Sequence, residues 1–105
     1  MAFMPEYQEV EPTRDEIDRR PGLLLLEFGN GWCGHCQAAT PAAKALLEEH
    51  PEIEHLRIAD GRGKPLGRSF RVKLWPTFVL LRDGQSLGEA VRPGRQELDA
   101  LAERL

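Results

Sequence analysis

The chain lacks the features that mark several large classes of protein. It contains only two cysteines among 105 residues, which excludes a framework of several disulfides. Its longest apolar run, Leu23 to Leu26, is far too short to cross a bilayer. Its formal net charge of -3 gives no basic excess of the kind that nucleic-acid binding needs. We therefore expect neither a nucleic acid nor a membrane as a partner.

The N-terminal residues also lack the marks of a secretory signal. Residues 1–12 have no basic start and no apolar stretch, and they contain Pro5 and Pro12. We interpret them as an extended lead-in segment and expect a cytoplasmic protein. Stable structural disulfides are rare in that compartment, so a cysteine pair there indicates catalysis or metal binding.

The residues that are present suit one globular domain. The chain is 41% hydrophobic and 30% charged, and its length is close to the commonest size of a domain with its own core. We therefore take residues 1–105 as a single domain, and we expect it to be a monomer.

Local patterns predict alternating helices and strands. Thr13 begins a capping box that Glu16 completes, and a short helix to about residue 20 follows. Leu23 to Phe28 is apolar except at Glu27, as expected of a central strand buried on both faces. A longer helix begins near Cys33. The other predicted elements are strands at 53–59, 77–81 and 85–91, a short helix at 65–70 and a C-terminal amphipathic helix that ends at 105.

The predicted order of elements defines the fold class. A strand, a helix and a second strand at the front imply a right-handed parallel crossover. Asp83-Gly84 is a strong signal for an antiparallel hairpin. We therefore expect an α/β fold with a mixed parallel and antiparallel central sheet and helices on both faces.

The two cysteines are the most informative residues of the chain. They lie in Trp32-Cys33-Gly34-His35-Cys36, at the head of the predicted helix. A helix N-terminus favours the thiolate of Cys33, and Cys36 lies one turn deeper on the same face, as a resolving thiol would. Metal binding and a bracing disulfide are the alternatives. So short a loop removes little chain entropy, however, and with His35 the pair is one ligand short of a closed zinc site.

Two segments of the chain resemble the thioredoxin family. Residues 28–36 are similar to its active-site stretch, including the tryptophan before the first cysteine. Trp75-Pro76-Thr77 is similar to its cis-proline segment, and residues 69–72 resemble the lead-in to that segment. The resemblance extends from about residue 23 to residue 105. It implies a thioredoxin-like fold and a thiol–disulfide oxidoreductase that acts on protein disulfides through Cys33 and Cys36.

The resemblance also implies a proton-transfer role for Glu27. This residue takes the position of the family's buried acid, as a general acid/base for Cys36, and we expect burial to raise its pKa. A lysine often lies near that acid, but Arg57 is the only nearby cation here, and its side chain could face outward. We interpret His50 and His55 as structural.

The resemblance further predicts the residues of a substrate groove. Pro76 is expected to be cis and to pack against the disulfide, while the Trp75 backbone pairs with an extended substrate as an added strand. Trp32 and Gly34 are expected to line the groove. Trp75 and Arg92 depart from the family pattern, which has a small or β-branched residue and a glycine at these positions. Arg92 would narrow the groove or favour acidic partners.

Gly34-His35 is the dipeptide of protein disulfide isomerases, and a charged His35 would favour the thiolate of Cys33. We therefore expect a reduction potential between about -270 mV for thioredoxin and about -180 mV for the isomerase.

We expect no cofactor and no metal. A thioredoxin reductase-type or glutathione system would recycle the disulfide. The alternative function is a metal-handling or redox-sensing binding module that uses the same cysteines.

Overall fold

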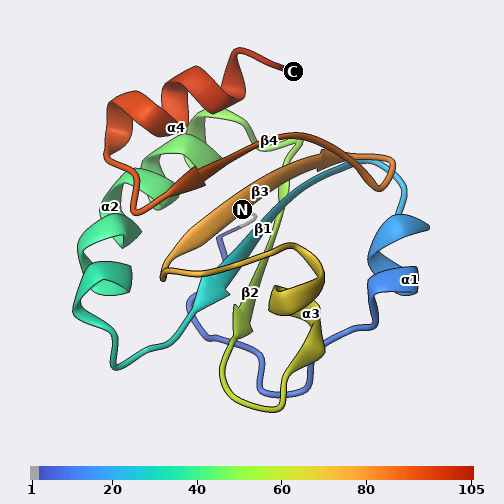
Figure 1. The fold of residues 1–105 in the computed structure, drawn as a ribbon. Helices are drawn as coiled ribbons and strands as arrows, with labels where there is room; N and C mark the ends of the chain where they lie inside the picture. The colour runs from blue at the N-terminus through green and yellow to red at the C-terminus, as the bar shows by residue number, and fades with distance from the viewer. Residues whose placement is uncertain (1–2) are drawn as a thin grey trace.

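Helices and strands alternate along the chain in the predicted order. The structure is a computed structural model and describes residues 3–105. No helix in these residues is both long enough and apolar enough to cross a lipid bilayer. The elements are α1 (Arg14–Asp18), β1 (Leu23–Gly29), α2 (Gly34–Glu49), β2 (Glu54–Ala59), α3 (Pro65–Ser69), β3 (Thr77–Arg82), β4 (Gln85–Val91) and α4 (Arg95–Ala102) (Figure 1).

The strands form one mixed sheet in the order β2-β1-β3-β4. Strand β1 is parallel to β2 and antiparallel to β3, and β3 pairs with β4 as a hairpin. At the hairpin turn, Asp83 and Gly84 have φ angles of 51° and 80°, as the central residues of a type I′ turn require. The predicted α/β fold, with a mixed sheet between two layers of helices, is confirmed.

An apolar core lies on each face of the sheet. One core joins Leu25 of β1 to α2 and α4, and the other joins Leu24 and Leu26 to α1 and α3. In Figure 1, α2 and α4 accordingly lie on one side of the sheet, and α1 and α3 lie on the other. Because side chains alternate along a strand, Glu27 points to the same face as Leu25, which α2 covers.

The segment before α1 runs along the outer edge of β2. The Gln8 N–H donates to the Arg57 carbonyl at 2.7 Å, and the Ala59 N–H donates to the Gln8 carbonyl at 3.0 Å, in an isolated parallel bridge. Of the lead-in segment expected over residues 1–12, residues 1 and 2 lie outside the described part of the chain. The bridge holds the neighbouring Tyr7 beside the sheet, where its side chain is half-buried.

Candidate active site

The two cysteines lie at the start of α2, and both are free thiols. Cys33 is the N-cap residue, and its sulfur accepts a hydrogen bond from the Cys36 N–H at an N···S distance of 3.3 Å. Cys36 is only 1% exposed, against 9% for Cys33. One thiol therefore lies at the rim of the site and the other lies beneath it.

The two thiols differ in acidity because their surroundings differ. Burial opposes a charge on Cys33, but hydrogen bonds from Cys36 and from the His35 backbone N–H, with the charge of Arg92, lower its pKa overall. Burial and the hydrogen bond with Cys33 raise the pKa of Cys36 to about 11. Cys33 is therefore the more reactive nucleophile at neutral pH, whereas Cys36 needs a base to ionise.

Glu27 is buried on β1 and accepts hydrogen bonds on both of its carboxylate oxygens. Oε1 accepts from Nε2 of His55 at 2.8 Å. Oε2 accepts from the Tyr7 hydroxyl at 2.8 Å and from Nη2 of Arg57 at 3.1 Å. Burial alone would raise the pKa of Glu27, but hydrogen bonding from His55 and the charge of Arg57 lower it overall. The sequence-based expectation of a raised pKa is therefore wrong, and the group is a carboxylate at neutral pH.

A second hydrogen bond to the His55 ring determines which ring nitrogen carries the proton. Nδ1 of His55 accepts a hydrogen bond from the Met4 backbone N–H at 2.9 Å. Nδ1 therefore carries no proton, and the proton of the neutral ring lies on Nε2, which donates it to Glu27. The Phe3 ring stacks on the same imidazole at a centroid distance of 5.4 Å. His55, interpreted from the sequence as structural, thus directly contacts the buried acid.

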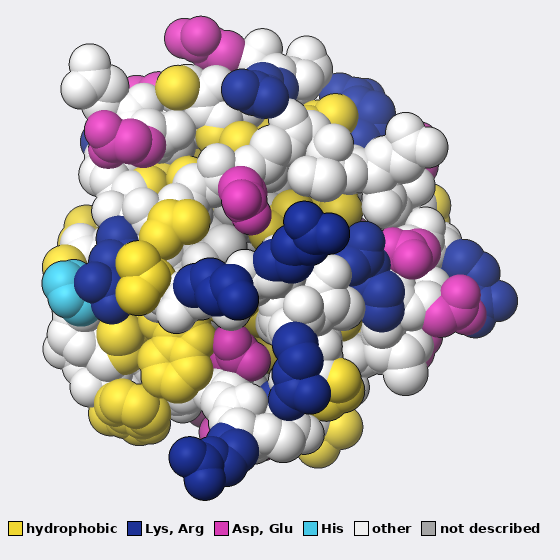
Figure 2. Space-filling model, in the orientation of Figure 1, with side chains coloured by type: hydrophobic (Ala, Val, Ile, Leu, Met, Phe, Trp, Pro, Cys, Tyr) yellow, Lys and Arg dark blue, Asp and Glu magenta, His cyan; other side chains and the backbone are white. Residues whose placement is uncertain are grey.

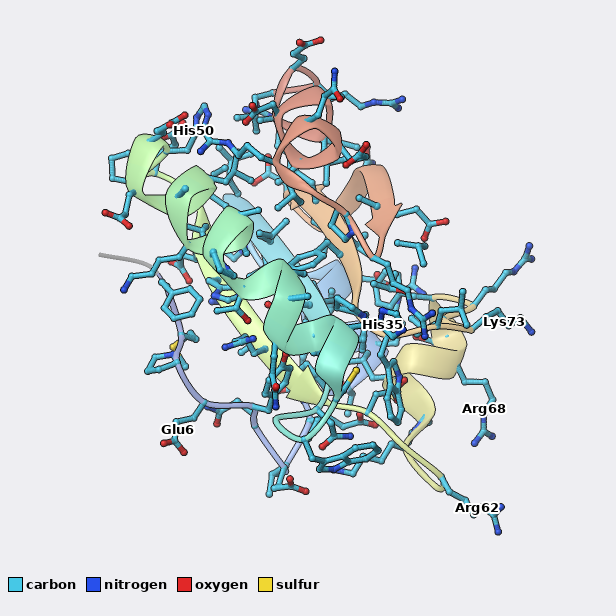
Figure 3. The ribbon with its side chains drawn as sticks, turned by 90° about the vertical axis from the view of Figure 1, so that its left-hand side faces the viewer. Glu6, His35, His50, Arg62, Arg68 and Lys73 are labelled. Carbon is cyan, nitrogen blue, oxygen red and sulfur yellow. The ribbon has the colours of Figure 1, made fainter. Side chains whose placement is uncertain are left out.

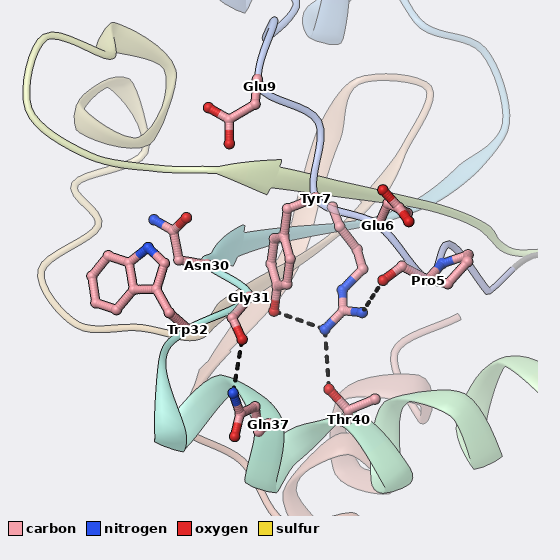
Figure 4. Close-up of a pocket in the computed structure, with 10 residues that line it drawn as sticks. Pro5, Glu6, Tyr7, Glu9, Asn30, Gly31, Trp32, Gln37 and Thr40 are labelled. Atoms are coloured by element: carbon pink, nitrogen blue, oxygen red, sulfur yellow. Dashed lines mark hydrogen bonds between the residues drawn. The ribbon is translucent and has the colours of Figure 1, made fainter.

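Arg57 faces inward and is only 4% exposed, so the outward orientation that the sequence left open does not occur. Its Nη2 donates to the Tyr7 hydroxyl at 2.7 Å and to Oγ1 of Thr40 at 3.0 Å (Figure 4). Its Nη1 donates to the Pro5 carbonyl at 3.2 Å. The guanidinium lies over the Tyr7 ring, 4.1 Å from the centroid. Arg57 thus provides the cation near Glu27 and connects the N-terminal segment to α2.

Trp32, which precedes Cys33, and the half-buried Trp75 form an apolar wall. Trp32 is 74% exposed, and its ring meets that of Trp75 edge-on at a centroid distance of 5.7 Å. Nε1 of Trp75 donates to Oδ2 of Asp60 at 2.9 Å, which ties the ring to the residue after β2. The Trp75–Pro76 peptide bond is cis, and Pro76 is buried.

Arg92 lies against the same loop. Its φ of 49° falls in the region that favours glycine, the residue that the family pattern has at this position. Its Nε donates to the Trp75 carbonyl at 2.8 Å, and its backbone N–H donates to the Pro76 carbonyl at 2.8 Å. The Trp75 carbonyl, part of the backbone that was expected to pair with an extended substrate, is therefore already hydrogen-bonded to Arg92.

Gly34 and His35 form the first turn of α2, and both are exposed. Figure 3 labels His35. His35 influences Cys33 through its backbone N–H, which favours the thiolate. A Cβ on Gly34 would meet open space, so packing does not require glycine at this position. An accessible first turn leaves room for a substrate to approach Cys33.

Sequence patterns missed two residues that complete the site, Gly29 and Tyr7. A Cβ on Gly29 would lie 2.6 Å from the Cys36 sulfur and 3.4 Å from the Tyr7 oxygen, so only glycine leaves room for the thiol. The one signal for Gly29 was its place at the end of a buried strand. Tyr7 lies 20 residues from Glu27 in the sequence, and no local pattern indicates their contact.

A pocket of about 460 Å³ opens beside the site, between the N-terminal segment, the loop after β1, and α2 (Figure 4). Tyr7, Thr40 and Arg57 lie in its wall, so solvent reaches the edge of the Glu27 network. Within residues 3–105, no cluster of three or more His, Cys, Asp or Glu side chains is arranged to hold a metal ion.

An acidic thiol at a helix N-terminus, above a second thiol that keeps its proton, is a site of the thiol–disulfide oxidoreductase class. The family model called Thioredoxin matches residues 6–105, so the chain belongs to the thioredoxin family. Members of this family are thiol–disulfide oxidoreductases, and the predicted resemblance is confirmed.

Individual relatives agree with this assignment. Thioredoxin 2 from Pseudomonas aeruginosa PAO1, solved in its reduced form, is 46% identical with a TM-score of 0.83, over 98% of this chain and 100% of its own. Thioredoxin from Chlamydia trachomatis serovar D is 33% identical over 76% of each chain. Protein disulfide-isomerase A2 from Pongo abelii is 31% identical over 96% of this chain. The chain spans 23% of that isomerase and 56% of thioredoxin H2-1 from Oryza sativa subsp. japonica.

The unequal surroundings of the thiols predict two well-separated titrations in the reduced protein. The pKa of Cys33 should lie below the usual range of a thiol, and that of Cys36 should lie near 11. The ¹³Cβ shifts of selectively labelled cysteine, followed against pH by NMR, resolve the two groups without a substitution. Two titrations that overlap near about pH 8.5 would contradict this assignment.

Replacing Glu27 with Gln should destabilise the protein by about 3–5 kcal/mol at pH 7, because buried Arg57 loses its counter-charge. Folding lowers the pKa of Glu27, so its contribution is complete above its unfolded value, near 4.5. That contribution is lost as the pH falls through the lower folded pKa. Urea unfolding at several pH values should therefore show the largest difference from wild type at neutral pH.

Glu48→Gln is the matched control for this experiment, because Glu48 is exposed on α2. Its effect should stay within about 0.5 kcal/mol at each pH. A similar loss of stability in both variants, or a loss in Glu27→Gln that does not shrink in acid, would be inconsistent with a paired carboxylate.

Proposed function

We propose that this chain is a thiol–disulfide oxidoreductase that exchanges its Cys33–Cys36 dithiol and disulfide with disulfides of protein substrates. The observation that carries the proposal is the unequal pair of thiols at the start of α2. Cys33 has a lowered pKa at the rim, and Cys36, beneath it, has a pKa of about 11. These are the properties that a nucleophile and a resolving thiol require. Membership of the thioredoxin family supports the same reaction.

Reduction of a substrate takes place in two exchanges. The Cys33 thiolate attacks one sulfur of the substrate disulfide, and the other sulfur leaves as a thiolate and takes up a proton. Cys36 then loses its proton and attacks the Cys33 sulfur, which breaks the bond to the substrate and forms the Cys33–Cys36 disulfide. The substrate gains the two electrons and two protons that the dithiol loses. Oxidation of a substrate dithiol follows the same steps in reverse.

Glu27 is proposed as the base for the second exchange. Its lowered pKa keeps it as a carboxylate at neutral pH, and it is buried on the face of the sheet that α2 covers. The negative charge gives the Cys36 proton an acceptor inside the protein. His55 and Arg57 support this role because their hydrogen bonds hold the carboxylate in one orientation.

Serine substitutions at the two cysteines should separate the two exchanges. Cys33→Ser should abolish the reduction of insulin disulfides, measured by turbidity with dithiothreitol as the electron source. Cys36→Ser should still attack and should accumulate a mixed disulfide with the substrate, detected by mass spectrometry without reductant. Insulin reduction that persists in Cys33→Ser would exclude Cys33 as the nucleophile.

The exposed charges support a preference for acidic protein substrates. Figure 2 shows Lys and Arg side chains beside hydrophobic ones on one face, and Figure 3 shows Arg62, Arg68 and Lys73 pointing outward on the same side of the molecule. Arg71 and Arg92 are also exposed, and none of these five residues forms an ion pair within residues 3–105. Unpaired cations near an apolar wall favour a disulfide flanked by acidic residues.

Arg92→Gly should lower the preference for acidic substrates by about 2- to 5-fold, because it removes a cation whose charge acts on Cys33. Glycine also accepts the positive φ at this position. The measurement is kcat/KM for two peptide disulfides that differ only in flanking Glu or Lys. The preference should weaken at high salt, which screens exposed charges.

Arg82→Ala is the charge-matched control for Arg92→Gly, because it also removes an exposed cation. Arg82 is the last residue of β3, whereas the end of β3 that follows Pro76 is Thr77. The ratio of kcat/KM for the two peptides should not change in this variant. A wild-type protein that does not distinguish the Glu peptide from the Lys peptide would refute the acidic preference.

Recycling of the disulfide is proposed to depend on a thioredoxin reductase-type or glutathione system, because members of this family are typically recycled by reductase systems. The monomeric state, the cytoplasmic location and the intermediate reduction potential stay predictions from the sequence.

A further inference from the structure

The Tyr7 hydroxyl lies where the N-terminal segment meets the buried acid. It donates its proton to Oε2 of Glu27 at an O···O distance of 2.8 Å. It also accepts a hydrogen bond from Nη2 of Arg57 at 2.7 Å. A phenolic hydroxyl can both donate and accept hydrogen bonds, as a group that relays a proton must.

The Cys36 thiol is a close neighbour of that hydroxyl. The Cys36 sulfur and the Tyr7 oxygen lie 2.6 Å and 3.4 Å from the point that a Cβ on Gly29 would occupy, which limits their separation to at most 6.0 Å. Burial raises the pKa of both groups. Beyond burial, the Tyr7 hydroxyl favours ionisation of Cys36, and a Cys36 thiolate disfavours ionisation of Tyr7. The two groups are therefore electrostatically coupled.

The segment that carries Tyr7 is fixed on both sides of this residue. The Met4 N–H donates to the ring of His55, and Gln8 exchanges backbone hydrogen bonds with β2. Arg57 packs against the Tyr7 ring itself. These contacts hold the hydroxyl on Oε2 of Glu27, so the N-terminal segment supplies a pre-positioned group to the site.

We propose that the Tyr7 hydroxyl relays the proton of Cys36 to Glu27 in the step that resolves the mixed disulfide. This inference rests on the proposed oxidoreductase function and extends its site to the N-terminal segment. The Cys36 sulfur gives its proton to the Tyr7 oxygen while the Tyr7 proton passes to Oε2 of Glu27, and no electron is transferred. The Cys36 thiolate then attacks the Cys33 sulfur, and the bond from Cys33 to the substrate breaks.

The relay gives the proton of the buried thiol a direct path to a carboxylate. With a pKa of about 11, Cys36 is ionised in only about one molecule in ten thousand at pH 7. The Tyr7 oxygen stays neutral throughout, because its own proton leaves as the new one arrives. Protonated Glu27 then returns the proton to solvent by way of the pocket in whose wall Tyr7 and Arg57 lie (Figure 4).

Stopped-flow reaction of reduced protein with a limiting amount of the chromogenic disulfide DTNB separates the two exchanges. The first thionitrobenzoate released reports attack by Cys33, and the second reports resolution by Cys36. Tyr7→Phe should leave the first phase within about 2-fold of wild type and slow the second about 10- to 100-fold at pH 7. The difference should disappear as the pH approaches about 11, where Cys36 ionises without a base.

Two further variants test whether the hydroxyl itself is responsible. Phe3→Leu loosens the packing of the same segment but keeps the hydroxyl, and it should leave both phases unchanged. Tyr7→Phe added to Glu27→Gln should slow the second phase no further, because both changes interrupt one relay. Equal slowing by Phe3→Leu and Tyr7→Phe, or a wild-type second phase in Tyr7→Phe at pH 7, would overturn the relay. A missing first phase in the wild-type protein would instead overturn the oxidoreductase function.

A fluorinated tyrosine at position 7 provides a second test of the relay if the Tyr7→Phe variant does not fold. Tyr7 is the only tyrosine of the chain, so biosynthetic incorporation of 3,5-difluorotyrosine changes this ring alone and keeps its hydroxyl. Because fluorination makes the phenol more acidic, the second phase should change by about 3-fold or more while the first phase does not. A second phase with an unchanged rate and pH dependence would overturn the relay.

Discussion

The buried ion pair between Glu27 and Arg57, on the face of the sheet that α2 covers, is the interaction on which the rest of the site depends. A buried carboxylate costs several kcal/mol unless other groups replace the water that it loses. Here Arg57 and His55 come from β2, and Tyr7 comes from the N-terminal segment. The side chains of β2 that face α2 thus include the two that satisfy this carboxylate. The carboxylate also anchors the segment before α1, in whose described residues, 3–13, the one strand-like pairing is a single bridge at Gln8.

The two thiols differ because they lie at different depths at the start of α2. Cys33 lies at the open end of α2, where N–H groups and a nearby cation favour its thiolate, whereas Cys36 faces the interior and keeps its proton. Replacing both partners of a buried ion pair with apolar residues often leaves a protein equally stable. In this protein such a replacement at Glu27 and Arg57 would leave Cys36 without the proposed base. In the proposed mechanism, reactivity would thus require this carboxylate even where stability does not.

The sequence was sufficient to predict the helices, the strands and the cysteine pair, because these depend on local periodicity and spacing. The orientation of Arg57 needed one further step. Leu56 and Ile58 pack into one core, so His55 and Arg57 face the opposite side of β2, and that side is also interior because α2 covers it. The contact of Tyr7 depends on how a segment without periodicity crosses the edge of the sheet. No local pattern encodes that path, so the sequence could not reveal it.

The edge-on contact between Trp32 and Trp75 has an optical consequence. These residues are the only two indoles of the chain; Trp32 precedes Cys33, Trp75 packs against Trp32, and neither belongs to the two apolar cores. Tryptophan emission from the folded chain therefore originates at one place on its surface. In the proposed function, a docked peptide would shield these rings from water. The intrinsic emission would therefore report substrate binding without an added label.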